Sequence, residues 1–351
     1  MSEQETSAEQ THMTFDREES DSDQQVDDQK EADAKEAFQQ RLSILSSEKI
    51  RSPLHKEDHS TPQTAGSPTS LMILDESLGG SSLGENEATA CSPRMMECLT
   101  KVEKALNSLY DGDNDVSSRT LELKFHEMGN EEAEELSHAL DSNRDAMVHL
   151  NLLGNRRIGL SGWRHLSHAL SVQTQLQTLS LSLVDMGDTG VIALASRFPN
   201  TLVSLDLSEN AVSDKGAISL ASWFASSGDI KELRLGHNNI GDVGAAKLAA
   251  ALTKNTSLQT LDLSFNQIEG KGGRALAYSL KRNSTLQIMN LRHNRVESDG
   301  ARLLAQALLR NKSLEELDLR ANNIGMTASF FARTLRKNTS LRSLDLGENS
   351  L

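Results

Sequence analysis

The chain has 351 residues, a formal net charge of −14 and only 3% aromatic residues, so it is long enough for more than one domain. Residues 1–40 carry 13 Asp and Glu against three Lys and Arg, which leaves the rest of the chain close to neutral. A balanced body behind an acidic segment lacks the basic footprint that non-specific nucleic-acid binding requires. We therefore expect no nucleic-acid partner.

The sequence shows no sign of secretion or of a membrane. It opens with Met-Ser-Glu-Gln-Glu-Thr, without the basic start and apolar run of a signal peptide. No stretch approaches the ~18 apolar residues of a membrane helix. Six residues separate Cys91 from Cys98, which matches no zinc or redox spacing. We expect a protein of the cytoplasm or the nucleus, with no membrane partner and no metal.

Residues 1–93 are predicted to form a disordered acidic tail. They are rich in Ser, Asp, Glu and Gln, and such a segment cannot bury enough apolar surface to offset its ordering entropy. Four prolines of this tail each follow a Ser or Thr, and these dipeptides are typical of turns. They are also the pattern that proline-directed kinases use. The candidate phosphorylation sites are Ser52, Thr61, Ser67 and Ser92.

Residues 94–119 are predicted to form a capping helix followed by a linker. Apolar residues there step by four and three, as on one face of a helix, at Met95, Leu99, Val102, Leu106 and Leu109. The first coil of a repeat array has an apolar flank without a neighbour, so a cap is expected at this point.

From residue 120 the chain repeats one pattern. Its clearest copy is Leu261-Asp-Leu-Ser-Phe-Asn266-Gln-Ile268, followed by Gly272, Leu276 and Leu280. Successive copies start 26 to 29 residues apart, at Leu121, Leu150, Leu179, Leu205, Leu233, Leu261, Met289, Leu317 and Leu344. A fixed period in the twenties with the pattern L-x-L-x-x-N is typical of a leucine-rich repeat solenoid.

Each copy predicts one strand and one helix. Leu261 and Leu263 alternate with polar residues, as in a half-buried strand, whereas Leu276 and Leu280 are four apart, as on one face of a helix. Because helices are wider than strands, stacked copies form an α/β horseshoe with a concave parallel sheet and convex helices. Residues 120–351 would hold about eight full repeats and one partial repeat.

The recurring polar residues have structural explanations. The amide after each strand, as in Asn266, is expected to satisfy backbone groups where the strand turns. His126 and Val184 stand in this place in the first and third repeats, where we expect irregular turns. Acidic residues at helix starts are expected to cap them: Asp188, Asp214, Asp242 and Asp299. A second set, each in an Asn-x-Ser/Thr triplet, is expected to cap helix C-termini in the left-handed conformation: Asn255, Asn283, Asn311 and Asn338.

This repeat length, with Gly and then Leu-x-x-x-Leu in a helix, resembles the ribonuclease-inhibitor subfamily of leucine-rich repeats. The resemblance covers residues 120–351, and relatives include the Ran GTPase-activating proteins and the repeat regions of NOD-like receptors. It implies a horseshoe that binds proteins on its concave face or rims. The acidic tail has no counterpart in this pattern.

The concave face is the predicted binding surface. Residues between and just after the strand leucines project there, and in the later repeats they mix acidic, basic and imidazole groups around Phe265. An aromatic side chain ringed by charges is the composition of a protein-binding hot spot, although a solvated sheet face with incidental charges gives the same pattern. The candidate binding residues are Asp206, Arg234, His237, Asp262, Phe265, Arg292, His293, Asp318 and Arg320.

The sequence contains no phosphate loop, nucleophile elbow or His-x-x-x-His pair, so we expect no enzyme and no cofactor. The function predicted is a protein-interaction scaffold with a phosphoregulated tail. The alternative is a GTPase activator of the Ran type, for which Arg156 and Arg157 on a rim loop are weak support. Because the chain stops inside a ninth repeat, we also expect either a truncated gene model or end-to-end self-association.

Overall fold

The computed structural model describes Thr100 and residues 119–145 and 147–349. The predicted tail, its phosphorylation candidates and, apart from Thr100 and Arg119, the predicted capping helix lie outside the described residues. The chain divides into two units after Pro93, and all elements given below belong to the second. None of its described helices combines the length and the apolar character needed to span a membrane.

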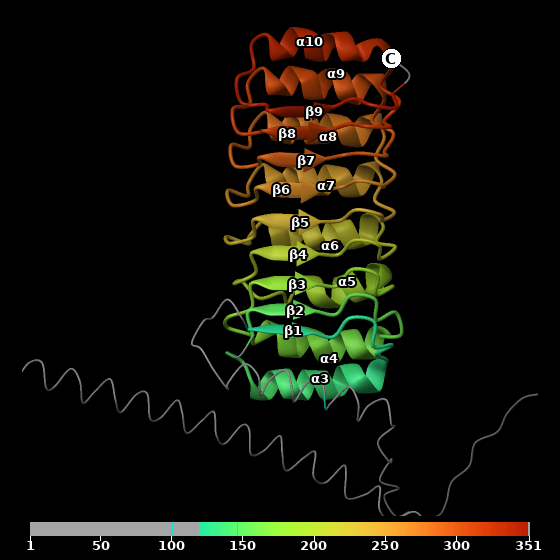
Figure 1. Cartoon of the computed structure of the whole chain (residues 1–351), viewed down its shortest axis with the longest axis vertical. Coiled ribbons are helices and arrows are strands. Elements are labelled where there is room, and N and C mark those ends of the chain that lie inside the picture. The colour runs from blue at the N-terminus through green and yellow to red at the C-terminus, as the bar shows by residue number, and fades with distance from the viewer. Residues whose placement is uncertain (1–99, 101–118, 146, 350–351) are drawn as a thin grey trace, which may run out of the picture. The chain divides into compact units, whose positions relative to one another are not determined.

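The described residues alternate between short strands and helices (Figure 1). The strands are β1 (Thr120–Glu122), β2 (His149–Asn151), β3 (Thr178–Ser180), β4 (Ser204–Asp206), β5 (Glu232–Arg234), β6 (Thr260–Asp262), β7 (Ile288–Asn290), β8 (Glu316–Asp318) and β9 (Ser343–Asp345). The helices are α3 (Asn130–Ser142), α4 (Leu160–Ser171), α5 (Gly187–Ala195), α6 (Asp214–Phe224), α7 (Asp242–Leu252), α8 (Gly270–Leu280), α9 (Glu297–Leu308), the 3₁₀ turn η2 (Gly325–Thr327) and α10 (Ala328–Leu335).

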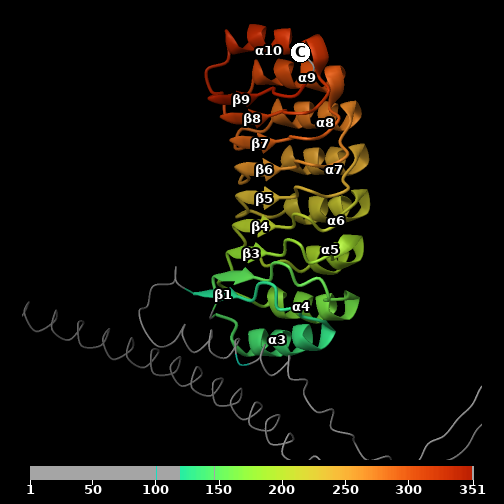
Figure 2. The ribbon, with the colours of Figure 1, turned by 45° about the vertical axis from the view of Figure 1, so that its right-hand side comes forward.

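The strands form one parallel sheet of nine strands, in chain order. Its register matches the sequence period, because Leu233 pairs with Leu261 and Leu261 with Met289. The helices form a second layer that bows outward in Figure 2, so the sheet lines the concave side. The predicted leucine-rich repeat solenoid is confirmed.

The core lies between the two layers. Leu261 and Leu263 of one repeat are buried together with Leu276 and Leu280 of its helix, as their spacing predicts. The glycine that recurs in the first turn of the helices allows close stacking. A Cβ atom at Gly272 would lie 2.6 Å from Ile268 Cγ2 and 2.7 Å from Asp242 Oδ1.

A ladder of buried asparagines joins the turns after the strands. Asn238 Nδ2 donates to the carbonyls of Leu235 (3.1 Å) and Gly236 (3.1 Å) and, across the repeat boundary, to that of Leu207 (3.0 Å). Its Oδ1 accepts from the backbone N–H of Val212 (2.9 Å). The predicted role is confirmed, and each amide also links two coils. The ladder members are Asn155, Asn210, Asn238, Asn266, Asn294, Asn322 and Asn349.

The turns at His126 and Val184, which lack this asparagine, contain a second residue with positive φ, at Glu127 (52°) and Asp185 (53°). The same feature occurs at Ala211 and Asn323, in repeats that have the asparagine. Loss of the asparagine therefore does not by itself account for the irregular turns.

The second set of asparagines does not cap helices in the left-handed conformation, and that prediction was wrong. None of these four described residues has a positive φ. Asn283 Nδ2 instead donates to the carbonyls of Leu252 (3.0 Å) and Asn255 (3.1 Å), and its Oδ1 accepts from the N–H groups of Thr285 and Leu286. The Asn-x-Ser/Thr triplets thus form a second buried ladder between repeats, at Asn255, Asn283, Asn311 and Asn338.

The acidic residues at the helix starts cap the helix of the following repeat rather than their own. Asp188 Oδ1 accepts from the N–H of Ser213 (2.8 Å) and of Gly216 (2.9 Å), and its Oδ2 accepts from Ser213 Oγ (2.6 Å). Asp299 differs, since it lies 4.0 Å from Arg302 on its own helix. The same bridging arrangement joins Asp214 to Gly241 and Gly244, and Asp242 to Glu269 and Gly272.

The ladder gives a stability prediction. The substitution Asn238→Ala leaves several buried backbone groups in two adjacent turns without hydrogen-bond partners. Each such group costs on the order of 1–3 kcal/mol. We expect the free energy of unfolding, measured by urea denaturation of the full chain, to fall by more than about 2 kcal/mol. Asn200→Ala, at an exposed asparagine, is the control and should change little. Equal effects of the two variants would contradict the structural role of the ladder.

The inter-repeat cap gives a pH prediction. Burial raises the pKa of Asp188, but the hydrogen bonds from Ser213 and Gly216 outweigh it, so the pKa lies below the ordinary value of 3.8. A carboxyl with a lowered folded pKa stabilises the fold above its ordinary pKa, and this contribution is lost as the pH falls through the folded value. Asp188→Asn should therefore reduce stability at pH 7, by about 1 kcal/mol because the group is partly exposed.

Denaturant titrations between neutral and strongly acidic pH check this expectation. The difference between wild type and Asp188→Asn should shrink as the pH falls below the ordinary value of 3.8. A difference that is constant with pH would show that the carboxylate charge is not what stabilises α6. Asp229→Asn, at an exposed carboxyl, serves as the control.

Candidate functional site

The candidate residues lie on the concave wall, where the strands bring them into rows. Arg234 pairs in register with Asp206 on one side and with Asp262 on the other. Asp318 stands in the same row two strands beyond Asp262, with Asn290 between them. Neighbouring strands lie ~4.8 Å apart, so this row places Arg234 close to a carboxylate on either side.

The three aspartates of this row also shape the backbone. Oδ1 of Asp206, Asp262 and Asp318 accepts the N–H two residues further on, at 2.9, 2.8 and 2.8 Å. These bonds fix the exit of each strand, as side chains of this type commonly do. Each aspartate therefore has a structural role in addition to the binding role predicted for it.

An aromatic stack spans three repeats just beyond the strand ends. The rings of His237 and Phe265 lie 4.0 Å apart between centroids at 12°, and those of Phe265 and His293 lie 4.3 Å apart at 16°. The sequence predicts an exposed Phe265, whereas the structure shows it half-buried between the two imidazoles.

The three rings lie on left-handed turns next to the asparagine ladder. His237, Phe265 and His293 directly precede ladder residues, and all three have left-handed backbones, with φ of 54°, 52° and 52°. Non-glycine residues adopt this conformation at a cost, so the surrounding bonds must impose it. The asparagine that follows Phe265 binds the carbonyls of Leu263 and Ser264, which closes the turn around that residue.

Two of the three candidate arginines already have acidic partners. Arg234 Nη2 lies 2.5 Å from Glu232 Oε1 on the same strand, and Arg320 Nη2 pairs with Glu348 Oε1. The hydrogen bond from Arg320 holds the pKa of the Glu348 carboxyl below its ordinary value, and the same bond raises the pKa of Arg320. His293 Nε2 lies 4.0 Å from Glu348 Oε2.

Arg292 is the candidate arginine without such a partner among the described residues. Its Cζ lies 5.9 Å from the Phe265 ring centroid, at the limit of a cation–π contact. Its Nε is buried and has no hydrogen-bond partner. Arg292 therefore combines a guanidinium that forms no ion pair with another described residue and an adjacent aromatic ring.

Sequence reasoning left Glu232 and Glu348 out of the candidate site. Glu232 stands two residues before Arg234, on the same strand face, and Glu348 stands 28 residues after Arg320. Both spacings are visible in the sequence and could have indicated these pairs. In the part of the chain that the structure describes, no group of three or more His, Cys, Asp or Glu side chains could hold a metal ion.

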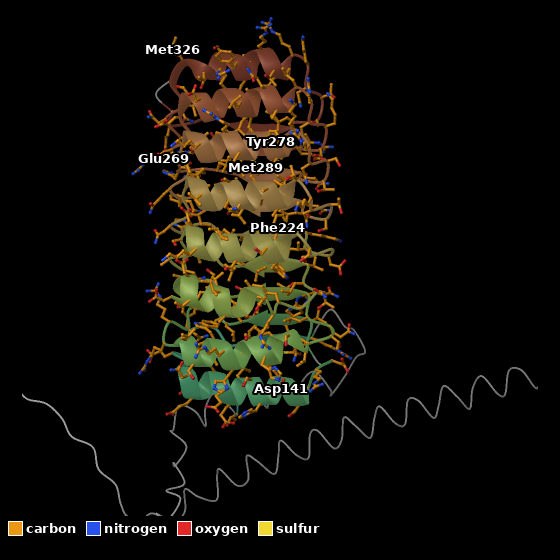
Figure 3. All side chains as sticks on the ribbon, turned by 180° about the vertical axis from the view of Figure 1, so that it is seen from behind. Asp141, Phe224, Glu269, Tyr278, Met289 and Met326 are labelled. Carbon is orange, nitrogen blue, oxygen red and sulfur yellow. The ribbon has the colours of Figure 1, made fainter. Side chains whose placement is uncertain are left out.

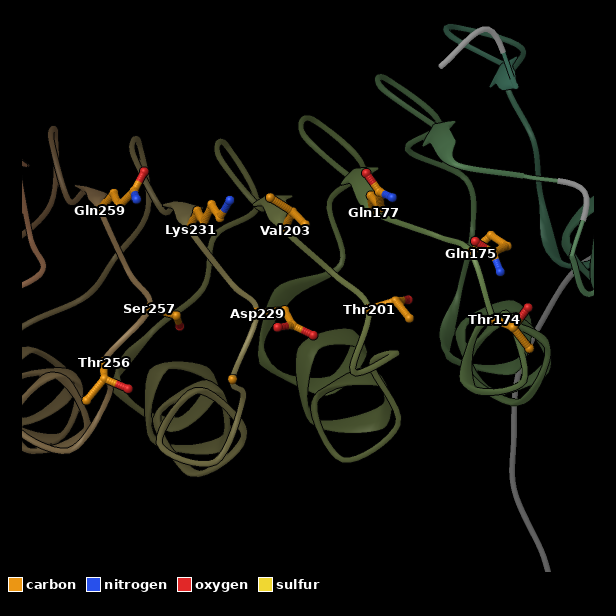
Figure 4. A pocket seen from close by; sticks show the side chains of 11 residues that line it. Thr174, Gln175, Gln177, Thr201, Val203, Asp229, Lys231, Thr256, Ser257 and Gln259 are labelled. Atoms are coloured by element: carbon orange, nitrogen blue, oxygen red, sulfur yellow. The ribbon is translucent and has the colours of Figure 1, made fainter. Parts of the chain in front are cut away.

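A hollow of about 530 Å³ follows the loops that lead from the helices to the strands (Figure 4). Asp229 and Lys231 are the only charged residues among those that line it, and most of the others are Thr, Ser and Gln. It lacks an aromatic side chain, whereas the concave wall has three stacked rings. The concave wall is therefore the stronger candidate for a binding site.

A match to a protein family agrees with this architecture. The family model described as "Leucine Rich repeat" matches six segments, at residues 173–195, 198–221, 229–249, 254–277, 282–305 and 310–326. Among solved structures, the chain is similar to "Leiomodin-1 Actin-Binding Site 2", with 24% identity and a TM-score of 0.35, over 38% of this chain and 78% of that chain. No curated protein matches. The chain therefore contains tandem leucine-rich repeats between residues 173 and 326.

The stack allows a test of whether Phe265 serves stability. Phe265→Ala should lower the free energy of unfolding by less than about 1.5 kcal/mol, because the ring is only half-buried and its contacts are two stacked imidazoles. Phe224→Ala should cost about 3–5 kcal/mol, because Phe224 is 1% exposed in the core (labelled in Figure 3). Chemical denaturation of both variants measures this. Similar losses would mean that Phe265 is a core residue and not a surface one.

Proposed function

We propose that this protein is a non-enzymatic interaction scaffold that binds a protein partner on its concave wall. The observation that carries the proposal is the His237–Phe265–His293 stack beside the unpaired Arg292. Aromatic and arginine side chains dominate the binding energy of protein interfaces, and they do so where they are already ordered before binding. The left-handed turns supply this order.

The charges around the stack suggest how a partner is recognised. Arg292 is suited to a carboxylate of the partner, because its guanidinium lies beside Phe265 and forms no ion pair with another described residue. The aspartates Asp206, Asp262 and Asp318 each commit one oxygen to the backbone, so the second oxygen can accept from a basic side chain. Arg234 and Arg320 would bind a partner only by giving up their ion pairs with Glu232 and Glu348 for new ones with the partner. This requirement favours selectivity over affinity.

Three finer points belong to the same proposal. The repeat pattern resembles the ribonuclease-inhibitor subfamily, and we propose that relationship for residues 120–351. Phosphorylation at Ser52, Thr61, Ser67 or Ser92 would add negative charge to an already acidic tail and regulate binding. We also propose that the protein is located in the cytoplasm or the nucleus.

Affinity purification with the full chain tests the concave wall. Wild type is compared with Phe265→Ala/Arg292→Ala and with Lys215→Ala/Lys247→Ala, a control pair on the helical face. Loss of two hot-spot side chains costs about 2 kcal/mol or more each, so we expect the partner to be absent from the first variant and retained by the control. Quantitative mass spectrometry of the bound proteins gives the readout.

If the concave variant retains the same proteins as wild type, the concave wall is not the binding surface. Circular dichroism and thermal denaturation of both variants establish that they are folded. Benzoylphenylalanine in place of the exposed Arg234 should then cross-link the partner, whereas the same group in place of Ile192 on α5 should not. The reverse pattern would assign binding to the helices.

A GTPase activator of the Ran type is the second candidate. The observation that favours it is the exposed pair Arg156 and Arg157 on the loop after β2, although Arg157 lies 3.8 Å from Glu127. A GTP-hydrolysis assay with Ran separates the two functions. The scaffold proposal predicts no acceleration by the full chain, whereas acceleration by orders of magnitude that is lost in Arg156→Ala/Arg157→Ala would establish the alternative.

A further inference from the structure

A groove of about 790 Å³ lies between α8 and α9, on the helical side of the solenoid. Tyr278 is labelled on this side in Figure 3. The first helix contributes Arg274 and Tyr278 to the lining, and the residue after it contributes Lys281. The second helix and the loop after it contribute Arg302, Leu303, Gln306, Leu309 and Arg310.

The groove is lined by four cations and no acidic residue. Arg302 lies 4.0 Å from Asp299, which is outside the lining. The other three, Arg274, Lys281 and Arg310, form no ion pair with another described residue. Like charges held close together raise the energy of the empty site, and an anionic ligand removes that cost.

The repeat architecture does not require these residues. One repeat earlier, α7 has Ala246 and Ala250 at the positions of Arg274 and Tyr278. Two repeats earlier, α6 has Ile218 and Ser222 there. The fold thus forms equally well with small or apolar side chains at these positions.

The helix dipole explains only part of the charge. Lys281 and Arg310 follow the C-termini of α8 and α9, where cations are favourable. Arg274 and Arg302 lie in the middle of their helices, where the dipole gives a cation little stabilisation. These two arginines turn a pair of ordinary helix ends into a continuous basic groove.

Apolar groups accompany the cations. Tyr278 is 58% exposed, and Arg282 Cζ lies 3.7 Å above its ring centroid, which holds the ring on the surface. Ala277 and Ala307 form a buried floor, and Leu309 is exposed at the rim. A ligand for this site therefore carries both negative charge and an apolar side chain.

We propose that the groove between α8 and α9 binds an acidic peptide segment of a partner protein, with carboxylates at its four cations and an apolar side chain against Tyr278. A peptide fits better than a nucleic acid, because the mid-helix cations Arg274 and Arg302 are not continued along the solenoid: the same position holds Ala246 on α7 and Ile218 on α6. The site lies on the opposite layer from the concave wall, so the two surfaces can act independently.

The test uses the full 351-residue chain and a fluorescein-labelled synthetic peptide with eight glutamates around a central Leu-Phe pair. The groove variant is Arg274→Ala/Tyr278→Ala, which installs the residues that α7 already carries. Fluorescence anisotropy should show a dissociation constant about tenfold or more higher for this variant than for wild type. The dissociation constant of wild type should also rise when NaCl is increased from about 50 to about 300 mM. A second variant, Lys281→Gln/Arg310→Gln, should weaken binding in the same way and covers a failure of the first to fold.

Lys215→Ala/Lys247→Ala removes two cations from α6 and α7 and is the matched control. It should bind the peptide as wild type does, and a peptide with Gln in place of Glu should not bind. Equal weakening by the control variant would reduce the effect to net charge and overturn the proposal. Tighter binding of a DNA duplex or of anionic lipid vesicles, with the same sensitivity to the groove variant, would overturn it in favour of that ligand. Neither result bears on the concave wall, whose variant is Phe265→Ala/Arg292→Ala.

Discussion

The buried asparagine after each strand is the interaction on which the rest of the structure depends. Its amide donates to carbonyls of its own coil and of the preceding one, and its oxygen accepts backbone N–H groups across the same boundary. One side chain thus closes the turn and joins two repeats. Each asparagine follows a residue with a left-handed backbone, and in three neighbouring repeats these residues are His237, Phe265 and His293, whose rings stack on the concave wall. The turns that the ladder joins therefore also carry the candidate binding surface.

Most of the fold could be predicted from the sequence, because each repeat states the same pattern of leucines and the strands pair in the register of that pattern. The details that failed concern polar side chains that have two reasonable partners. Asn283 has the position of a helix cap, yet it bonds to the preceding repeat, which is far away in sequence. Asp188 was expected to cap α5 and caps α6 instead. A period indicates that neighbours exist but not which of them a side chain selects.

The candidate surfaces show the same limit. The repeat period correctly predicts that Arg234 lies beside Asp262 in the sheet, since that depends on register alone. It did not reveal that Arg320 is held by Glu348, because a long flexible side chain has several partners within reach. The groove between α8 and α9 was missed for a different reason. Its cations come from two successive repeats, and only the packing of α8 against α9 combines them into one surface.

Hydrogen exchange at individual backbone amides tests the central role of the asparagine ladder most directly. The N–H groups of Val212, Ile240 and Ile268 are bonded to ladder oxygens at 2.9, 2.9 and 3.1 Å. The account predicts that these three amides, resolved by NMR, exchange only through unfolding of large parts of the solenoid, with protection close to that of the buried strands. Rapid exchange at these positions, comparable with exposed loops, would contradict it, since the turns would then open without disturbing the coils that they are said to join.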